Sequence, residues 1–311
     1  MSRDHLPWGP VVPAEVVWND QGEPLSTVYN DCYFSQNDGA GESQHVFLGG
    51  NGLPQRWQTH SFANFCIAET GFGTGLNFLL TWQAWRDSPS QPDIHYIAFE
   101  KHPLSKQDLE RALSLWPALR PLASELLDAY PGLLPGEHRL LFEGGRLTLD
   151  LWWTDADEAL ADIASHGERW VDAWYLDGFA PARNQSMWQT TLYQYAAALS
   201  RKGATLATFT VAGTVRRGLS EAGFEVAKQP GFGRKRECLR AVLGDIHSSA
   251  PDVTGPHWDL RNAQPACPES AIVLGGGLAG CAIAAALARR GVLVTLVERG
   301  KLAAGGSGID R

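Results

Sequence analysis

Two glycine-rich turns, each set between a strand-like and a helix-like run, constrain the fold of this 311-residue chain most strongly. The first has the sequence ETGFGTG (residues 69–75) and the second GGGLAG (residues 275–280). Glycines at such positions let the backbone turn tightly and approach a ligand, and the following helix directs free N–H groups at it. The chain is therefore expected to contain two ligand-binding βα units.

Strand-like and helix-like runs alternate between residues 65 and 242, which predicts an α/β fold with a parallel sheet covered on both faces. Three late strands in series predict an antiparallel hairpin at one sheet edge. The first 60 residues are expected to be irregular. The expected strands are 65–69, 95–100, 139–142, 146–152, 173–176, 204–210, 224–227 and 238–242; the expected helices are 76–85, 105–130 with interruptions at Pro117 and Pro121, 157–165, 187–199 and 215–221.

Residues 246–270 are rich in proline and show little periodicity, which predicts a linker. The expected domains are therefore 1–245 and 271–311. The second glycine turn follows an apolar strand (271–274) and begins a helix, and Glu298 ends the next strand 18 residues after Gly280. Glycines at 275, 277 and 280 with that acid form a dinucleotide-binding fingerprint. Residues 271–311 have room for only one βαβ unit, so this domain is expected to be truncated.

The composition excludes several classes of protein. The 26 basic and 34 acidic residues give a net charge of −8, which argues against a nucleic-acid binder that relies on bulk charge. Five widely spaced cysteines without a CxxC motif argue against a disulfide framework or a zinc ribbon and fit the cytoplasm. The histidines form no HExxH motif, so no metal site is expected.

No targeting or membrane segment is expected. The N-terminus lacks the apolar region of a signal peptide. Residues 271–288 are uncharged over 18 positions, near the length of a transmembrane helix. Three consecutive glycines interrupt them, however, which favours a strand, a turn and a helix.

The first glycine turn differs from the dinucleotide fingerprint. It has the form E-x-G-x-G-x-G and resembles the cofactor loop of S-adenosylmethionine-dependent methyltransferases. Glu100 ends the next strand 25 residues after Gly75, where an acid can accept hydrogen bonds from ribose hydroxyls. A turn without a ligand is the alternative. The candidate cofactor-binding residues here are Glu69, Gly71, Gly73, Gly75 and Glu100.

The sequence DAWYLDGFAP (residues 172–181) indicates a strand that ends in an acid and a tight turn. It resembles in position the Asn/Asp-Pro-Pro-Tyr motif of amino-group methyltransferases, in which a side chain and a turn carbonyl hold the substrate nitrogen. Asp177 would lie at the carboxyl end of the fourth sheet strand, where open α/β sheets bind ligands. The alternative is a structural cap of the turn.

Motifs between about residue 25 and residue 242 together resemble the bifunctional tRNA 5-methylaminomethyl-2-thiouridine biosynthesis family. They are DCYFS (31–35), VFL (46–48), NGLP (51–54), ETGFGTGLNF (69–78), LDGFAP (176–181) and GFGRKRE (231–237). The resemblance implies a Rossmann-like class I methyltransferase domain followed by an FAD-dependent oxidoreductase domain. The flavin half would remove a carboxymethyl group from a modified wobble uridine of tRNA, and the methyltransferase half would methylate the exposed aminomethyl nitrogen.

The resemblance also implies roles for individual residues. Asp177 would be catalytic, and Asp155 would bind the adenine amino group, with a helix N-cap as its alternative. Asp31, Phe179 and Pro181 would contact the substrate. The candidate FAD-binding residues, Gly275, Gly277, Gly280 and Glu298, would serve only in the full-length family.

Residues 201–240 carry nine basic and three acidic side chains, a local excess on an acidic chain. Such a surface suits tRNA phosphates, and a solvated face without a partner is the alternative. The candidate tRNA-binding residues are Arg216, Arg217, Arg234, Lys235 and Arg236.

Three functions fit the sequence. The first is an S-adenosylmethionine-dependent tRNA aminomethyl-uridine methyltransferase, expected to be a cytoplasmic monomer without a metal. The second is a flavin oxidoreductase. The third is an aminopropyl transferase or a catalytically silent tRNA-binding domain on the same fold.

Overall fold

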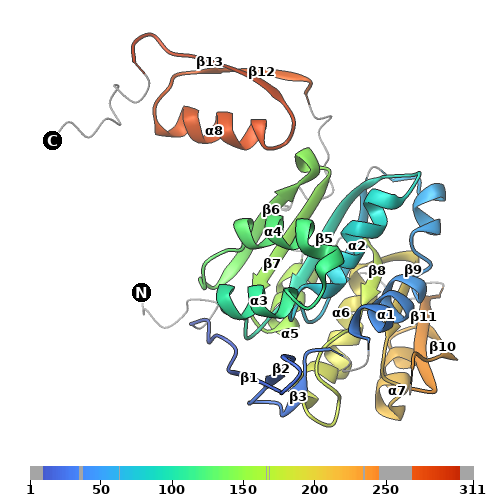
Figure 1. The fold of residues 1–311 in the computed structure, drawn as a ribbon. Helices are drawn as coiled ribbons and strands as arrows, with labels where there is room; N and C mark the ends of the chain where they lie inside the picture. The colour runs from blue at the N-terminus through green and yellow to red at the C-terminus, as the bar shows by residue number, and fades with distance from the viewer. Residues whose placement is uncertain are drawn as a thin grey trace, which may run out of the picture. The chain divides into compact units, whose positions relative to one another are not determined.

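The structure is a computed structural model that describes residues 10–34, 38–62, 64–165, 167, 169–233, 235–244 and 268–301. The chain divides into two compact units (Figure 1). The larger takes Met1–Leu140 and Leu149–His257, and the smaller takes Leu141–Thr148 and Trp258–Arg311.

The larger unit is built on an eight-stranded sheet in the order β10-β11-β9-β8-β4-β5-β7-β6. Strand β4 pairs in parallel with β5 and β8, and β8 with β9, whereas β11 pairs antiparallel with β9 and β10. The sheet is therefore mixed, and the predicted antiparallel hairpin at its edge is confirmed. The strands are β4 (Asn64–Glu69), β5 (Asp93–Phe99), β6 (Gly136–Phe142), β7 (Leu147–Trp153), β8 (Val171–Tyr175), β9 (Ser200–Thr208), β10 (Phe224–Pro230) and β11 (Glu237–Leu243).

The prediction that Asp177 follows the fourth strand of the sheet was wrong, because Asp177 follows the fifth strand. Along the chain, β8 is the fifth strand of the large sheet, because both β6 and β7 join it, with β6 at the outer edge. Its neighbours in space are β4 and β9. The end of β8 therefore still lies beside the end of the strand that carries the first glycine turn.

Helices cover both faces of the sheet, as predicted (Figure 1). Two expected helices are shorter than predicted. The run at 105–130 divides around a 3₁₀ turn at Pro117–Leu119, but Pro121 lies in the first turn of a helix, where its missing N–H is no loss. The run at 187–199 begins as a 3₁₀ turn at Gln185–Trp188. The helices are α2 (Leu76–Asp87), α3 (Lys106–Leu113), α4 (Arg120–Ala129), α5 (Ala156–Ala164), α6 (Thr190–Leu199) and α7 (Gly213–Glu221).

The two sheet faces bury alternate residues of each strand, as the period of two requires. On β4, Cys66 and Ala68 belong to the core cluster that includes residues of α5, α6 and α7. Ile67 and Glu69 therefore face the opposite side, where Phe78 of α2 meets the Tyr96 ring edge-on at 5.2 Å. The tryptophan pairs Trp82/Trp85 and Trp152/Trp153 are buried in this core.

The described residues among the first 60 contain more regular secondary structure than predicted. They form a three-stranded antiparallel sheet of β1 (Val16–Trp18), β2 (Pro24–Ser26) and β3 (Asp31–Cys32). Helix α1 (Gly39–Ser43) continues into a π-helical segment (Gln44–Gly49). Strands of two or three residues are too short to produce the alternation from which strands are predicted.

The smaller unit contains parallel strands β12 (Ser270–Leu274) and β13 (Leu293–Val297), connected by α8 (Leu278–Ala288). The predicted strand, turn and helix are therefore confirmed. Large apolar side chains of its strands are exposed, among them Leu274 at 79% and Leu293 at 72%. Among the described residues, no helix has the length and apolar character needed to cross a membrane.

Candidate active site

A cavity of about 550 Å³ opens where parallel strands of the large sheet end. Four loops contribute to its wall: residues 70–74 after β4, 100–102 after β5, 155–156 after β7 and 177–180 after β8. Side chains from residues 29–34, from α1 and from the turn between β10 and β11 complete the wall. The cavity therefore occupies the position at which open α/β sheets bind ligands.

The first glycine turn is packed too closely for other residues. Gly73 and Gly75 have φ values of +52° and +69°, in the left-handed region that favours glycine. A Cβ on Gly75 would lie 2.7 Å from the Phe72 ring, and one on Gly71 would lie 3.0 Å from the Asp177 carbonyl oxygen. Gly71 and Gly73 lie on the cavity wall, as predicted, whereas Gly75 supports the turn from behind it.

Glu69 does not lie on the cavity wall, contrary to the role predicted for it. It is fully buried beneath α2, where its carboxylate accepts hydrogen bonds from Asn77 Nδ2 at 2.6 Å and from the Tyr96 hydroxyl at 2.9 Å. Burial raises its pKa well above the usual value. This position follows from strand parity, because Glu69 shares the α2 face of β4 with Ile67. Glu69 anchors the helix that follows the glycine turn.

Glu100 lies on the cavity wall and fixes the glycine turn from the neighbouring strand. Its two carboxylate oxygens accept hydrogen bonds from the backbone N–H groups of Gly73, at 2.9 Å, and His102, at 2.8 Å. Burial raises the pKa of Glu100 to about 7, and these hydrogen bonds oppose the rise. The carboxyl group can therefore change its charge near neutral pH.

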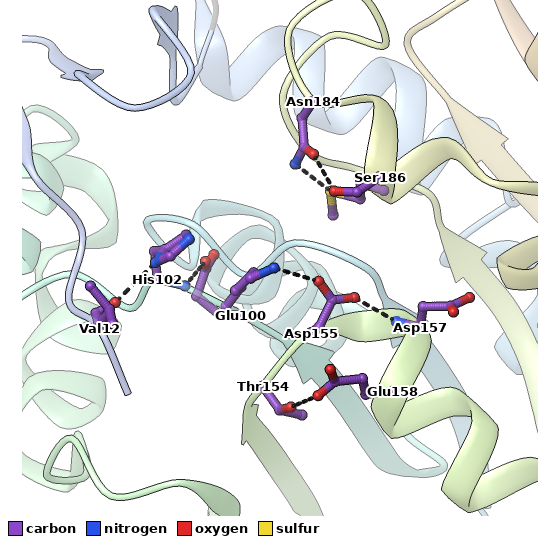
Figure 2. Close-up of polar contacts among 11 residues, drawn as sticks. Val12, Glu100, His102, Thr154, Asp155, Asp157, Glu158, Asn184 and Ser186 are labelled. Atoms are coloured by element: carbon purple, nitrogen blue, oxygen red, sulfur yellow. Dashed lines mark hydrogen bonds and ion pairs between the residues drawn. The ribbon is translucent and has the colours of Figure 1, made fainter. Parts of the chain in front are cut away.

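Asp155 has the N-cap role that was its alternative from the sequence, and its position leaves it available to a ligand. It is the N-cap of α5, since Oδ1 accepts from the Asp157 N–H at 3.0 Å, and it also lies on the cavity wall. Its Oδ2 pairs with Lys101 Nζ at 2.9 Å. Figure 2 shows Asp155 close to Glu100, and both residues line the cavity.

Asp177 lies on the wall directly after β8. Its carboxylate accepts hydrogen bonds from the Gly178 N–H at 2.8 Å and from Asn77 Nδ2 at 2.7 Å. Burial raises its pKa to about 6, against these two hydrogen bonds. Gly178 has a φ of +150°, and a Cβ there would overlap the Met187 sulfur. The turn thus holds an acid with fixed orientation and with an affinity for protons near that of a neutral-pH base.

Residues predicted to contact substrate gather beside Asp177, with one exception. Asp31 Oδ2 accepts a hydrogen bond from the Ala180 N–H at 2.9 Å, which joins the N-terminal sheet to the turn after β8. The Phe179 ring stacks on Tyr29 at 4.7 Å and meets Tyr33 edge-on at 5.1 Å. Pro181 does not lie on the wall. The result is an aromatic surface on the part of the cavity wall that carries Asp177.

Trp188 follows the turn after β8 closely in sequence but does not lie on the cavity wall. The side chain is buried, and its Nε1 donates to the Phe179 carbonyl oxygen at 2.9 Å. Trp188 therefore supports the turn after β8 from behind.

The structure separates the basic residues that were grouped by sequence. Lys235 lies on the cavity wall, with Nζ 2.7 Å from Glu42 Oε1. Arg216 and Arg217 are exposed on α7 and line a separate shallow hollow. Arg236 is exposed and away from the cavity wall, and Arg234 falls outside the described residues.

Sequence reasoning missed the residue that connects these parts. Asn77 donates to both Glu69 and Asp177, and its Oδ1 accepts a hydrogen bond from Ser43 Oγ. It is buried in the first turn of α2 among apolar residues. A polar side chain on such a helix, directly after a glycine turn, is the signal that could have identified it.

Glu298 contacts the second glycine turn, as the fingerprint predicts. Gly275 has a φ of +101°, and a Cβ on Gly280 would overlap the Gly275 carbonyl oxygen. Glu298 accepts hydrogen bonds from the Gly276 N–H at 2.6 Å and the Gly300 N–H at 2.9 Å. Gly277 caps the start of α8. Glu298, which follows β13, therefore contacts the glycine turn, and Gly280 packs against Gly275 from the first turn of α8.

Titration of Glu100 leads to a prediction about the cavity. A carboxylate accepts hydrogen bonds more strongly than a carboxylic acid, so affinity for a ligand that donates hydroxyl groups should fall as the pH drops through about 7. Measuring S-adenosylmethionine affinity between pH 5.5 and 8.5 by calorimetry tests this. Glu100→Gln cannot ionise and is the matched control. Identical pH profiles for the two proteins would exclude a role for the Glu100 charge in binding.

Comparison with known proteins gives one matching family model and several relatives. The model, described as an S-adenosyl-L-methionine-dependent methyltransferase, matches residues 117–244. The tRNA 5-methylaminomethyl-2-thiouridine biosynthesis bifunctional protein MnmC of Aliivibrio fischeri is 44% identical over 314 residues, covering 99% of this chain and 46% of that protein. The protein of the same description from Stutzerimonas stutzeri is 47% identical over 300 residues, covering 96% of this chain and 44% of that protein.

The chain therefore spans about half the length of the curated relatives it matches. Among solved structures, the crystal structure of MNMC2 from Aquifex aeolicus superposes with a TM-score of 0.58. It is 22% identical, and the match covers 76% of this chain and 72% of that one. At this identity the likeness shows the fold, a class I methyltransferase sheet.

Proposed function

Since the chain belongs to the MnmC family of S-adenosylmethionine-dependent methyltransferases, we propose that it methylates the aminomethyl nitrogen of 5-aminomethyl-2-thiouridine in tRNA. The product would be 5-methylaminomethyl-2-thiouridine. One observation carries the proposal: a single cavity joins the glycine turn and Glu100 to Asp177. The candidate sites for the methyl donor and for the methyl acceptor would thus lie next to each other in this cavity.

The cavity suits S-adenosylmethionine. Gly71 and Gly73 lack the side chains that would narrow it, and the acids there suit a cation better than a pyrophosphate. Glu100 would accept hydrogen bonds from ribose hydroxyls, and Asp155 from the adenine amino group. Glu69 and Gly75 would act indirectly, by holding the turn in shape. When bound, the cofactor supplies an electrophilic methyl group.

Asp177 would orient the acceptor amine. A primary alkylamine is mostly protonated near neutral pH, and its ammonium form has no lone pair for attack on a methyl group. The carboxylate can attract the ammonium, align it and accept a proton directly or through water. The same attraction raises the pKa of the amine and opposes proton loss, so orientation is the main role. Carbonyl groups of the 178–181 turn would accept the second N–H.

Transfer of a labelled methyl group tests the proposed function. The chain is incubated with tRNA carrying 5-aminomethyl-2-thiouridine and with intact, methyl-labelled S-adenosylmethionine. We expect label in the tRNA. Decarboxylated S-adenosylmethionine should not replace the intact cofactor, and transfer of its aminopropyl group would instead indicate an aminopropyl transferase. Binding of tRNA without any transfer would indicate a silent binding domain.

We also propose that tRNA phosphates contact the exposed arginines of α7, in a cytoplasmic enzyme that acts as a monomer. Arg216→Ala with Arg217→Ala should weaken tRNA binding and lower the slope of log affinity against log salt by roughly 1.4–1.8, because each phosphate contact releases counterions. Affinity for S-adenosylmethionine should not change. Lys106→Ala, which removes an exposed cation from α3, is the control. An unchanged salt slope in the double variant would place the tRNA surface elsewhere.

The smaller unit is proposed to be the start of an FAD-binding domain that begins near residue 271 after a linker at 246–270. We predict that the purified chain carries no flavin. A two-stranded unit with Leu274 and Leu293 exposed to more than 70% buries too little apolar surface to form a stable ligand-binding core. An absorption spectrum of the purified protein tests this, and a flavin band retained through gel filtration would refute it.

A further inference from the structure

A further carboxylate, which the proposed function does not use, lies on the wall of the same cavity. Glu42 belongs to α1, and its side chain is only 10% exposed. Its cationic partner is Lys235, whose Nζ lies 2.7 Å from Glu42 Oε1. A carboxylate this buried is costly without such a partner, so the place beside Glu42 is one that a cation fills.

Hydrogen bonds hold the helix that carries Glu42 against Asp177. Ser43 Oγ donates to Asn77 Oδ1, and Asn77 Nδ2 donates to Asp177 Oδ2 at 2.7 Å. At the start of α1, Asp38 accepts from the Gly41 N–H at 2.7 Å. The position of Glu42 is therefore fixed relative to the acid that orients the acceptor amine.

Close packing brings Lys235 to Glu42. A Cβ on Gly41 would lie 2.6 Å from the Phe232 ring, so only glycine lets the turn between β10 and β11 approach α1 this closely. That turn is closed by a hydrogen bond of 3.0 Å from the Lys235 N–H to the Phe232 carbonyl oxygen. Lys235 thus reaches the cavity because of a specific contact between two loops.

Lys235 is the more exposed member of the ion pair. Its side chain is 48% exposed, against 10% for Glu42, and its Nζ lies 4.7 Å from the centre of the Phe209 ring. A lysine ammonium on a flexible four-carbon stem can move into water at small cost, whereas a buried carboxylate cannot. The place beside Glu42 therefore accommodates one cation, which can be exchanged.

We propose that Glu42 recognises the primary amine of the acceptor substrate, and that Lys235 is an internal counter-ion which the substrate ammonium displaces. This inference rests on the proposed function. A primary ammonium has three N–H donors, so it can donate to Glu42, to Asp177 and to a turn carbonyl at once. After it loses a proton to become reactive, the neutral amine still has two donors for these acceptors.

The exchange preserves charge balance. One cation leaves Glu42 and another takes its place, so the buried carboxylate is never left without a partner. The charges of the pair already act on Asp177, whose pKa is raised mainly by burial and, to smaller degrees, lowered by Lys235 and raised by Glu42. The displaced Lys235 becomes free to contact a tRNA phosphate, which agrees with its predicted role as a tRNA-binding residue.

The arrangement also explains how the site would select its substrate. A uridine without the aminomethyl group offers no cation, so Glu42 would stay paired with Lys235. An amine that still carries a carboxymethyl group would bring a third carboxylate towards Glu42 and Asp177, and like charges disfavour this. The primary amine is thus the form that the two acids accept best.

Binding of two RNAs tests the proposal. The probes are an anticodon stem-loop with 5-aminomethyl-2-thiouridine and the same stem-loop with 2-thiouridine. Glu42→Gln keeps the size of the side chain but removes its charge, and it should reduce the preference for the aminomethyl RNA about tenfold, the scale of one charge-assisted hydrogen bond. The effect on methyl transfer should appear mainly in KM, with S-adenosylmethionine affinity unchanged. Glu110→Gln on α3 is the matched control.

A second variant, Lys235→Met, is expected to change the preference for the aminomethyl RNA in the opposite direction. Lys235→Met removes the internal competitor, so the preference for the aminomethyl RNA should rise even if affinity for both RNAs falls. A purely structural role of the ion pair would instead lower both affinities together and leave the preference unchanged.

The outcomes separate this inference from the proposed function. If Glu42→Gln keeps the wild-type preference, or if Lys235→Met fails to raise it, the role of Glu42 is refuted while methyl transfer by the wild type still supports the proposed function. If the wild type neither prefers nor methylates the aminomethyl RNA, the role of Glu42 and the proposed function are both refuted. Thermal unfolding of each variant shows whether it is folded. If Glu42→Gln does not fold, the result for Lys235→Met alone tests the role of Glu42.

Discussion

Asp177→Asn is expected to slow single-turnover methyl transfer by about 10²-fold or more, the scale of a general acid–base contribution. Asparagine keeps the shape and one acceptor oxygen, but it carries no charge to attract an ammonium and cannot accept its proton. Its amide group would also place an N–H near Asn77 Nδ2, which now donates to this carboxylate at 2.7 Å. S-adenosylmethionine affinity should persist, because the glycine turn and Glu100 remain intact.

The pH dependence of the same variant provides a second readout. The pKa of Asp177 is raised to about 6, so its carboxylate is present above that pH and is lost as the pH falls through it. The wild-type rate should therefore show an acidic limb near pH 6 that is absent from Asp177→Asn. Near-normal turnover by the variant would remove Asp177 from the reaction, and loss of cofactor affinity would assign it to the cofactor site.

Gly71→Val should weaken cofactor binding strongly. A Cβ at this position would lie 3.0 Å from the Asp177 carbonyl oxygen and 3.1 Å from Met187 Cε, and valine adds two further carbons. The glycine turn would have to move away from the end of β8. Overpacking of this kind costs about 1–3 kcal/mol, and roughly 1.4 kcal/mol is tenfold in affinity, so S-adenosylmethionine affinity should fall by about 10²-fold.

Gly132→Val is the matched control, because Gly132 is exposed and a Cβ there has no neighbour within 4 Å. Calorimetry with S-adenosylmethionine and thermal unfolding should be measured for both variants. The control should resemble the wild type in both. Wild-type cofactor affinity in Gly71→Val would mean that the ligand does not approach this turn.

The sheet and the two ends of the cavity could be predicted because the information is local. An apolar run that ends in an acid and a glycine turn marks β4 and β8, and Glu100 directly follows β5. Parallel strands bring such ends to one edge of the sheet. Local pattern also explains the errors in detail: Pro121 reads as a helix break but lies in a first turn, and strands of two or three residues carry no periodicity.

The remaining site could not be predicted, because it depends on contacts between distant segments. Asn77 meets Asp177 across 100 residues of sequence, and Lys235 meets Glu42 across nearly twice that distance. The cluster of positive charge suggested only a phosphate-binding surface for Lys235. The direction of the Glu69 side chain was also predicted wrongly. The E-x-G-x-G-x-G motif predicts a ligand contact for Glu69, whereas the alternation of side chains along β4 places it beneath α2.

Mass spectrometry of the wobble nucleoside is the most direct test of the central claim. The chain is incubated with intact S-adenosylmethionine and tRNA that carries 5-aminomethyl-2-thiouridine, and the tRNA is then digested to nucleosides. We predict that this nucleoside gains the mass of one methyl group, located on the side-chain nitrogen by fragmentation. An unchanged nucleoside, or a methyl group located on the base, the ribose or another nucleoside, would contradict the assignment.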